Sequence, residues 1–313
     1  MNYFRFRLRF DTPVHFGTPD SALSLYDSGD HFRGDTLFSA LCHMALQGNG
    51  VEGLEELLAL TRAGKLLLSD AMPWAGEDYY LPKPCQAAQA SGELPPEKRK
   101  ALKKLCWIPL GRMEEYCQCL KTGTLFEAPP LKLGVSSEVT KVTVPDRGDG
   151  VPYPLGVFRF REDRGLYFLA GLEDENVLPR LTQWVELLGL TGIGGRVSTG
   201  YGKFTVTEVA EVTSLWPSLS RREGPLLLLT TSLPREEELD AALAGAGFQL
   251  VRRGGFVASD GYAPTPRKKK TQYFLAAGAV VRAPFSGDLY GVGTGGGHPV
   301  YRYGKPLFWE VPL

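Results

Sequence analysis

The sequence lacks an excess of charge of either sign, a long apolar run and a regular set of cysteines. Lysine and arginine total 35, as do aspartate and glutamate, so the formal net charge is zero. Free-standing nucleic-acid-binding domains are usually basic, so any nucleic acid here would need a local basic face. No segment approaches the ~18 apolar residues of a membrane-spanning helix, and the N-terminus lacks the apolar core of a signal peptide. We therefore expect a cytoplasmic protein without membrane contact.

The five cysteines do not suggest a disulfide framework, because their number is odd and they are scattered. Cys106, Cys117 and Cys119 lie close together in the sequence, with Cys85 upstream. A zinc site is one interpretation, but C-x-C is not the usual C-x-x-C knuckle and no second knuckle follows. We favour reduced structural thiols and predict no metal and no cofactor.

The N-terminal segment YFRFRLRF alternates apolar and basic residues, which predicts a half-buried strand. Its basic face is either a solvated surface or a functional one, and the sequence leaves both open. Residues 35–45 place apolar side chains at helical spacing behind an N-capping Asp35 or Thr36. Residues 51–60 suggest a second short helix, and GKLLLSDAMPW predicts a buried strand that ends at Pro73.

The length of 313 residues favours about two domains. Residues 1–213 form the first, with an insertion at about 76–150 that carries a short helix near 97–105 and a long hairpin. A helix at 177–188 and the strand KFTVTEV complete it, and residues 225–313 form the second domain. The split βαβ pattern predicts an α+β protein of two ferredoxin-like (RRM-like) domains with antiparallel sheets and glycine-rich loops.

Two compact glycine blocks, TGIGGRVSTGYGKF and GVGTGGGHP, are the least ordinary features of the sequence. The phosphate-binding pattern G-x-x-x-x-G-K-[ST] is absent. A G-x-G-x-x-G match at Gly291, Gly293 and Gly296 lacks the helix that must follow it. A backbone without side chains can instead lie against the phosphates of an extended polyanion. Single-stranded RNA fits best, because its phosphates trace an irregular path and its 2′-hydroxyls offer further partners.

Several motifs together resemble the RAMP superfamily of CRISPR proteins. The glycine block after the last helix of the first domain is similar to the signature loop of that superfamily. FRGDTLFSALCHMAL, YYLPKP and GGGHPVYRYGKPLF resemble one branch, the crRNA 5′-handle-binding subunit of type III-A (Csm) effector complexes. The resemblance covers the chain from end to end.

The resemblance implies two packed ferredoxin-like domains whose glycine-rich loops hold the repeat-derived 5′ handle of the crRNA. It also implies docking to the large polymerase/cyclase-like subunit and to the backbone RAMP subunit, with no homo-oligomer. Docking through protein surfaces would explain the zero net charge. The hairpin around VTVPDRGDG resembles the thumb of the family. The implied RNA-binding residues are Gly192, Gly194, Gly195, Arg196, Ser198, Gly200, Gly202, Lys203, Arg33, His15, Arg147, Gly293, Gly295, Gly296, His298, Arg302 and Lys305.

Two rival functions remain open at the level of sequence. A metal-independent CRISPR RNA-processing endoribonuclease would need a base that activates a 2′-hydroxyl, usually histidine. His15 and His31 lie in the loop before the first helix, but no second histidine is close enough in sequence to form an obvious acid/base pair. The resemblance places this branch among non-catalytic subunits, so we expect no enzyme activity. The other rival is an RNA-binding module unrelated to CRISPR. The run PRKKK at 266–270 is either a phosphate-binding patch or a solvated loop.

Overall fold

The computed structural model describes residues 1–17, 25–85, 104–143, 149–259 and 261–313. Its largest element is a seven-stranded antiparallel sheet. Six of the strands follow the order β5-β4-β3-β8-β1-β9, and β2 also pairs with β8. The strands are β1 (Asn2–Phe10), β2 (Leu66–Leu68), β3 (Met72–Ala75), β4 (Asp78–Pro82), β5 (Trp107–Pro109), β8 (Arg164–Leu172) and β9 (Phe204–Glu211).

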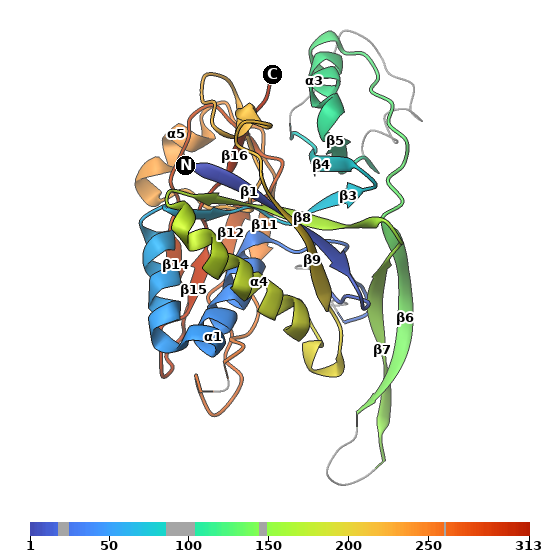
Figure 1. The fold of residues 1–313 in the computed structure, drawn as a ribbon, viewed down its shortest axis with the longest axis vertical. Helices are drawn as coiled ribbons and strands as arrows, with labels where there is room; N and C mark the ends of the chain where they lie inside the picture. The colour runs from blue at the N-terminus through green and yellow to red at the C-terminus, as the bar shows by residue number, and fades with distance from the viewer. Residues whose placement is uncertain (18–24, 86–103, 144–148, 260) are drawn as a thin grey trace.

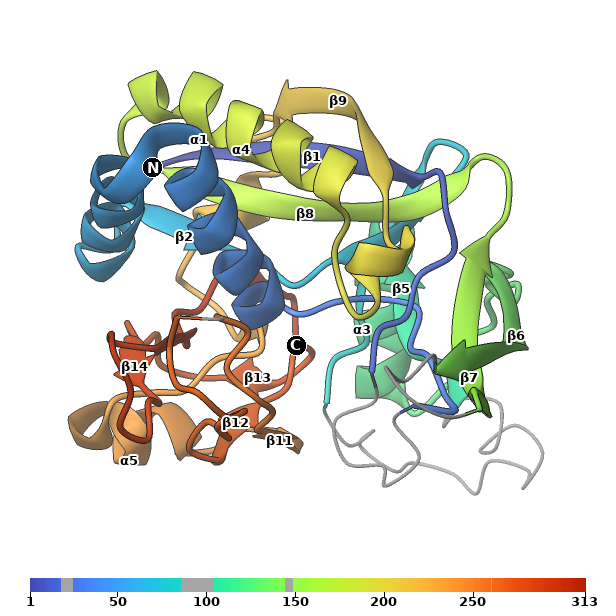
Figure 2. The ribbon, with the colours of Figure 1, turned by 90° about the horizontal axis from the view of Figure 1, so that it is seen from below.

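Two helices, α1 (Gly34–Arg62) and α4 (Leu178–Thr191), pack side by side on one face of this sheet (Figures 1 and 2). The alternation of β1 explains the contact, since Phe4, Phe6 and Leu8 all join the core that α1 and α4 cover. The two helices predicted at 35–45 and 51–60 are both present within α1 and meet at a kink at Gly50, where φ is 68° and ψ is −159° and the backbone is not helical. Glycine adopts this conformation readily because it has no Cβ, so Gly50 lets the chain change direction between the two helices.

The opposite face of the sheet is also covered. This cover decides whether the basic side chains of β1 form a solvated surface. Arg5 is 7% exposed, pairs with Glu208 at 2.7 Å and lies 4.1 Å from the centre of the Tyr79 ring. Arg7 lies 3.8 Å from the centre of the Trp74 ring. The solvated interpretation is therefore wrong for these two arginines, because aromatic rings pack against their guanidinium groups. The same packing makes this face unavailable as an open platform.

The C-terminal region, residues 225–313, forms several small antiparallel sheets. The sheet of β13 (Val280–Val281), β10 (Leu226–Leu228) and β16 (Phe308–Glu310) packs against the first sheet through a shared cluster that includes Tyr167, Leu227 and Trp309. The other elements are α5 (Leu239–Leu243), the pair β11 (Leu250–Arg253) and β12 (Gln272–Leu275), and the pair β14 (Leu289–Gly291) and β15 (Tyr301–Tyr303).

The predicted long hairpin is present as β6 (Gly134–Thr143) and β7 (Val151–Phe160), paired from Gly134–Phe160 to Thr143–Val151. It extends away from the body at the end of the sheet opposite α5 (Figure 1). The insertion also contains α3 (Met113–Thr122), a helix that the sequence did not predict, whose Tyr116 packs edge-on against Phe126. Most of the short helix predicted near 97–105 lies outside the described residues. None of the described helices is long and apolar enough to span a bilayer.

Candidate nucleic-acid interface

The glycine loop, residues 192–203, joins α4 to β9 and folds back on itself. Gly192, Gly194, Gly200 and Gly202 all have positive φ angles, of 99°, 101°, 86° and 76°. Ile193 N–H donates to Gly202 O at 3.0 Å. A Cβ at Gly202 would collide with the backbone carbonyl of Ile193, and one at Gly192 would lie 2.5 Å from Tyr201 O. These glycines are needed for the loop's own geometry.

Gly194 and Gly195 leave space for the segment before α1. Gly195 N–H donates to His15 O at 2.8 Å. A Cβ at Gly194 would lie 2.8 Å from the Phe16 ring, and one at Gly195 would lie 2.7 Å from the His15 ring. The protein's own chain therefore fills the space on the Cβ side of both glycines, and the approach of RNA to their backbone stays a prediction. At Gly200 a Cβ would meet nothing within 4 Å.

The outer side of the loop remains cationic and exposed. Arg196, Ser198 and Lys203 are all exposed. Arg196 adopts the left-handed conformation with φ 64° and ψ 23°, which is uncommon for a residue with a side chain. Its guanidinium lies 5.2 Å from the centre of the Tyr153 ring on β7. The loop and the β6–β7 hairpin thus meet at an exposed surface. Arg196, Ser198 and Lys203 contribute its hydrogen-bond donors.

His15 and His31 make separate contacts. The His15 side chain is 7% exposed, and its Nδ1 lies 2.7 Å from Gly156 O on β7. His31 Nδ1 lies 2.8 Å from the Asp30 carboxylate, and its ring packs edge-on against Trp107. His15 therefore anchors the segment before α1 to the hairpin rather than facing solvent, which corrects its prediction as an RNA contact.

The N-terminus of α1 is already satisfied within the protein. Arg33 is the N-cap residue, and the next N–H, from Gly34, donates to Asp70 Oδ1 at 2.8 Å. Asp70 also accepts hydrogen bonds from Thr231 N at 2.9 Å and Thr231 Oγ1 at 2.6 Å. A buried carboxylate thus occupies the first donor of this helix, and the expected contact of Arg33 with a phosphate stays a prediction. Asp70 instead ties α1 to the residues after β10.

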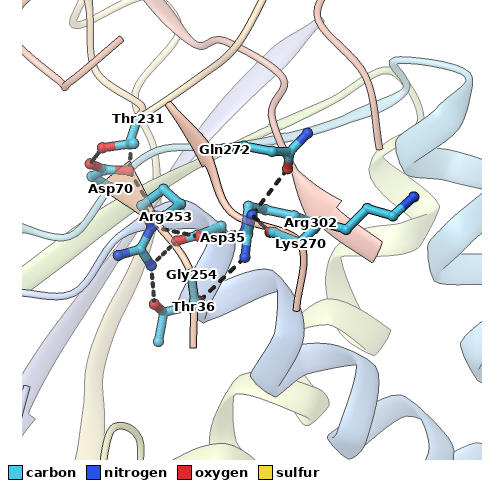
Figure 3. Close-up of polar contacts among 10 residues, drawn as sticks. Asp35, Thr36, Asp70, Thr231, Arg253, Gly254, Lys270, Gln272 and Arg302 are labelled. Atoms are coloured by element: carbon cyan, nitrogen blue, oxygen red, sulfur yellow. Dashed lines mark hydrogen bonds and ion pairs between the residues drawn. The ribbon is translucent and has the colours of Figure 1, made fainter. Parts of the chain in front are cut away.

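A second carboxylate of α1 joins the two parts of the chain (Figure 3). Arg253 of β11 donates to Asp35 through Nε at 2.9 Å and Nη2 at 2.8 Å. Burial raises the pKa of Asp35, but the charges of Arg253, Arg302 and Arg33 and the hydrogen bonds from Arg253 outweigh it, so the pKa lies below its ordinary value. Asp35 is therefore ionised at neutral pH and holds Arg253 in place.

Arg302 and Lys305 are not the surface contacts that the sequence predicted. Their exposures are 4% and 2%. Arg302 Nη1 donates to Lys270 O and to Gln272 Oε1, both at 3.0 Å (Figure 3). The protein itself uses the donors of Arg302, so its role is to position the strands around Arg253. The close packing of the C-terminal region also encloses Lys305.

The second glycine block wraps a tyrosine. Tyr262 Oη lies 3.0 Å from the position of a Cβ at Gly293 and accepts a hydrogen bond from Thr294 N at 2.7 Å. A Cβ at Gly296 would collide with the Tyr262 ring, so these two glycines serve packing, whereas a Cβ at Gly295 would meet nothing within 4 Å. His298 is exposed and lies 2.9 Å from Ser259 Oγ. Arg147 lies outside the described residues.

Between the glycine loop and the C-terminal region lies a cleft of about 450 Å³. On one side it is lined by α1 and the end of α4, together with Gly192, Ile193, Gly194 and Val197 of the loop. Facing them are Arg253, Gly254, Ala258, Lys269, Tyr301 and Arg302. The cleft thus places the predicted loop opposite a cationic wall contributed by segments more than fifty residues away in the sequence.

Sequence reasoning missed most of this wall. Lys269 belongs to PRKKK, which the sequence left open between a binding patch and a solvated loop. Lys269 lines the cleft, whereas Arg267, Lys268 and Lys270 are exposed. No sequence pattern indicated that Arg253 lies at the cleft, because only the tertiary fold pairs it with Asp35. His43 of α1 also lines the cleft.

The cysteines show no arrangement for a metal. All five are free thiols, and the described residues contain no group of three or more His, Cys, Asp or Glu that could hold an ion. Burial raises the pKa of the Cys117 thiol to about 11, and it raises that of Cys42 to about 12. Both side chains are therefore protonated at neutral pH, the state in which cysteine is inert.

Comparisons with known proteins agree over the whole length of the chain. The family model of the CRISPR Csm4 C-terminal domain matches residues 223–311. The CRISPR system Cms protein Csm4 of Mycobacterium tuberculosis (strain CDC 1551 / Oshkosh) is 38% identical over 315 residues, covering 100% of this chain and 99% of the relative. The Csm4 protein of Streptococcus thermophilus is 28% identical over 309 residues, covering 96% of each.

Solved structures match the fold. A chain of the Csm3-Csm4 subcomplex in the type III-A CRISPR-Cas interference complex superimposes with a TM-score of 0.65 at 17% identity, covering 100% of both chains. A chain of the Csm1-Csm4 cassette in complex with pppApA gives a TM-score of 0.64 at 22% identity, covering 100% of this chain and 99% of the other. Together with the 38% identity to the mycobacterial relative along the entire sequence, these findings show that the chain belongs to the Csm4 family of CRISPR proteins.

Proposed function

We propose that this chain is the non-catalytic subunit that holds the repeat-derived 5′ handle of the crRNA in a type III-A CRISPR (Csm) interference complex. The observation that carries the proposal is the cleft, in which the glycine loop faces Arg253, Lys269 and Arg302. Cations and backbone N–H groups are the usual partners of phosphate oxygens. Gly194 lines this cleft, and its N–H has no hydrogen-bond partner among the described residues.

The exposed side of the loop extends this path toward the hairpin. Arg196, Ser198 and Lys203 supply two cations and a hydroxyl group on one short segment. Single-stranded RNA follows such a surface because its phosphates are not confined to a regular helix. The binding surface is local, which fits the zero net charge of the whole chain. Family membership also removes the rival interpretation as an RNA-binding module unrelated to CRISPR.

The arrangement of the first sheet supports the ferredoxin-like interpretation of residues 1–213. The strand order β9-β1-β8-β2, with α1 and α4 on one face, is that of a split βαβ domain. We interpret β6–β7 as the thumb of the family and residues 225–313 as the second domain of this class. In this interpretation the candidate interface lies where the two domains meet.

The complexes in which the relatives are found suggest the protein partners of this chain. Csm4 chains are found in a Csm1-Csm4 cassette and in a Csm3-Csm4 subcomplex. We propose that this chain likewise docks the large polymerase/cyclase-like subunit and a copy of the backbone RAMP subunit, and that it acts as a single copy in a cytoplasmic ribonucleoprotein. The absence of a net charge favours docking through neutral protein surfaces over nonspecific binding to nucleic acid.

The surroundings of His15 and His31, the two histidines considered as candidate bases, favour binding without cleavage. A general base must reach the 2′-hydroxyl of the substrate. His15 is buried against Gly156 and the glycine loop, and His31 is held by Asp30 and Trp107. The alternative, a metal-independent endoribonuclease, has His31 with Asp30 as its best candidate pair.

Two assays test the proposed function and its alternative. The tagged chain is co-expressed with the other subunits and a CRISPR array, the complex is purified, and its bound RNA is sequenced. Recovery of crRNAs that share one repeat-derived 5′ end, dependent on this chain, is the expected result. The purified chain is then incubated with repeat-containing RNA with and without Mg²⁺. Site-specific cleavage that disappears in His31→Ala or His15→Ala would refute the non-catalytic assignment.

A further inference from the structure

One face of α1 presents a stripe of polar side chains to the cleft. Ser39, His43 and Gln47 recur at intervals of four residues, so they lie one above another on the helix surface. All three line the cleft. Among the described residues, none of these side chains has a hydrogen-bond partner, so they offer their donors and acceptors to whatever occupies the cleft.

The floor of the cleft beside this stripe is apolar. Met44, Leu188 and Ile193 all line it and are 3%, 2% and 2% exposed. They belong to the core between α1, α4 and the glycine loop, so their position is fixed by packing. A flat aromatic ligand would find here a nonpolar surface that runs along the polar stripe.

The opposite wall carries more positive than negative charge. Arg253, Arg302 and Lys269 face one carboxylate, that of Asp35. Burial lowers the pKa of Lys269, and the nearby charges of Arg302 and Arg253 lower it further. An anion bound in the cleft would relieve this repulsion.

Burial also lowers the pKa of His43, and the charges of Lys269 and His298 lower it further. His43 is therefore neutral at physiological pH, with one nitrogen that donates and one that accepts.

We propose that the cleft takes a single nucleotide of the bound RNA and reads its base, with Ser39, His43 and Gln47 hydrogen-bonding to the base edge. The base lies on the floor formed by Met44, Leu188 and Ile193, and its phosphate faces Lys269 and the glycine loop. The volume of about 450 Å³ lies within the range of about 300–1,000 Å³ that is usual for small-molecule sites. This inference rests on the proposed function and adds sequence selectivity at one position of the RNA.

The chemistry explains why such a site discriminates between bases. Unpaired polar groups that become buried under a ligand must be matched by its own donors and acceptors, and a mismatch leaves them unsatisfied. Sites built in this way reject a ligand that lacks the matching groups far more strongly than apolar sites do. Phosphate contacts hold the strand in register, and the base contacts then specify it.

The test uses a panel of single-stranded RNAs that carry the repeat-derived 5′ handle of the host CRISPR array. Each handle position is changed in turn to the other three bases and to an abasic ribose, and binding to the full chain is measured by fluorescence anisotropy. We expect one position at which base changes weaken binding by about tenfold, the scale of one well-matched base contact. At that position His43→Ala and Gln47→Ala should bind all four bases equally.

Leu46→Ala serves as the control, because Leu46 is an exposed residue of α1 that does not line the cleft. This variant should keep the discrimination of the wild type, and thermal unfolding of each variant checks that α1 is intact. If the RNAs bind equally well at every position, or if discrimination survives in both His43→Ala and Gln47→Ala, the base-reading inference is wrong while the proposed handle binding stands. If no handle RNA binds better than a scrambled RNA, the proposed function itself fails.

Discussion

Arg253 and Asp35 form a two-point hydrogen-bonded ion pair that fastens β11 of the C-terminal region to the first turn of α1. The Asp35 carboxylate is 7% exposed and the Arg253 side chain 15%. Arg302 lies 3.8 Å away from the same carboxylate. Because the cleft opens between these two elements, the pair fixes the separation of its walls as well as joining the two regions.

Removing the negative charge of this pair should destabilise the fold. In Asp35→Asn, Arg253 and Arg302 lose the charge of the carboxylate that they share in a buried site, and breaking a buried pair from one side costs about 3 kcal/mol. Urea unfolding of the purified chain measures the loss. Glu115→Gln, which breaks the exposed pair with Arg112, should leave the midpoint unchanged. A loss below about 1 kcal/mol for Asp35→Asn would mean that the pair does not hold the regions together.

The same pair predicts a pH dependence. The folded pKa of Asp35 is lowered, so its contribution is fully present above the unfolded pKa of about 3.9 and is lost as the pH falls through the folded pKa. The stability difference between wild type and Asp35→Asn should therefore be constant near neutral pH and shrink below about pH 4. Unfolding curves at a series of pH values for both proteins provide the check. A difference that grows toward low pH would contradict the assignment.

Two glycines of the same loop should tolerate alanine very differently. At Gly202 the added Cβ meets the Ile193 carbonyl and φ is 76°, so Gly202→Ala combines a collision with backbone strain. We expect a loss of more than about 2 kcal/mol. At Gly200 the space is open, and Gly200→Ala should cost only about 1 kcal/mol for its φ of 86°. Equal losses, measured by thermal unfolding, would show that the loop does not fold against itself as described.

Two substitutions of Arg196 can separate an effect on stability from an effect on RNA binding. Its left-handed backbone costs about 1 kcal/mol, which glycine relieves and alanine does not. Arg196→Gly should therefore unfold at a higher denaturant concentration than Arg196→Ala. Both variants lack the guanidinium, and both should bind handle RNA about tenfold more weakly than wild type. If the two variants were equally stable, the strain at this residue would be disproved; if they bound as well as wild type, Arg196 would not contact RNA.

Lys203 should contribute to RNA binding through its charge alone. Each phosphate contact to a single strand contributes a slope of about 0.7 to the plot of log affinity against log salt concentration. Lys203→Ala should lower that slope by about this amount at every handle sequence. Lys121→Ala removes an exposed lysine from α3, in the insertion, and should leave the slope as it is. An unchanged slope for Lys203→Ala would remove this residue from the binding surface.

The sequence was informative wherever a local pattern has one physical solution. Strict alternation in β1 and helical spacing in α1 and α4 predicted these elements, since a half-buried strand and an amphipathic helix each leave a period in the sequence. The motif order along the chain led to the family, which the 38% identity to a full-length relative then established. The helix α3 was not predicted, although its buried residues Met113, Tyr116 and Cys117 follow helical spacing.

The meaning of the glycines and of the charges depended on the tertiary structure. Sequence alone cannot tell whether a bare backbone awaits a ligand or accommodates another part of the chain, and at Gly194 and Gly195 it accommodates His15 and Phe16. The sequence likewise does not show whether a charged side chain is buried or exposed. In the structure Arg302 is buried, whereas Arg196 is exposed. Local sequence determined the strands and helices because hydrophobic periodicity is a short-range property. The cleft arose only from the fold, because its walls come from segments that packing alone brings together.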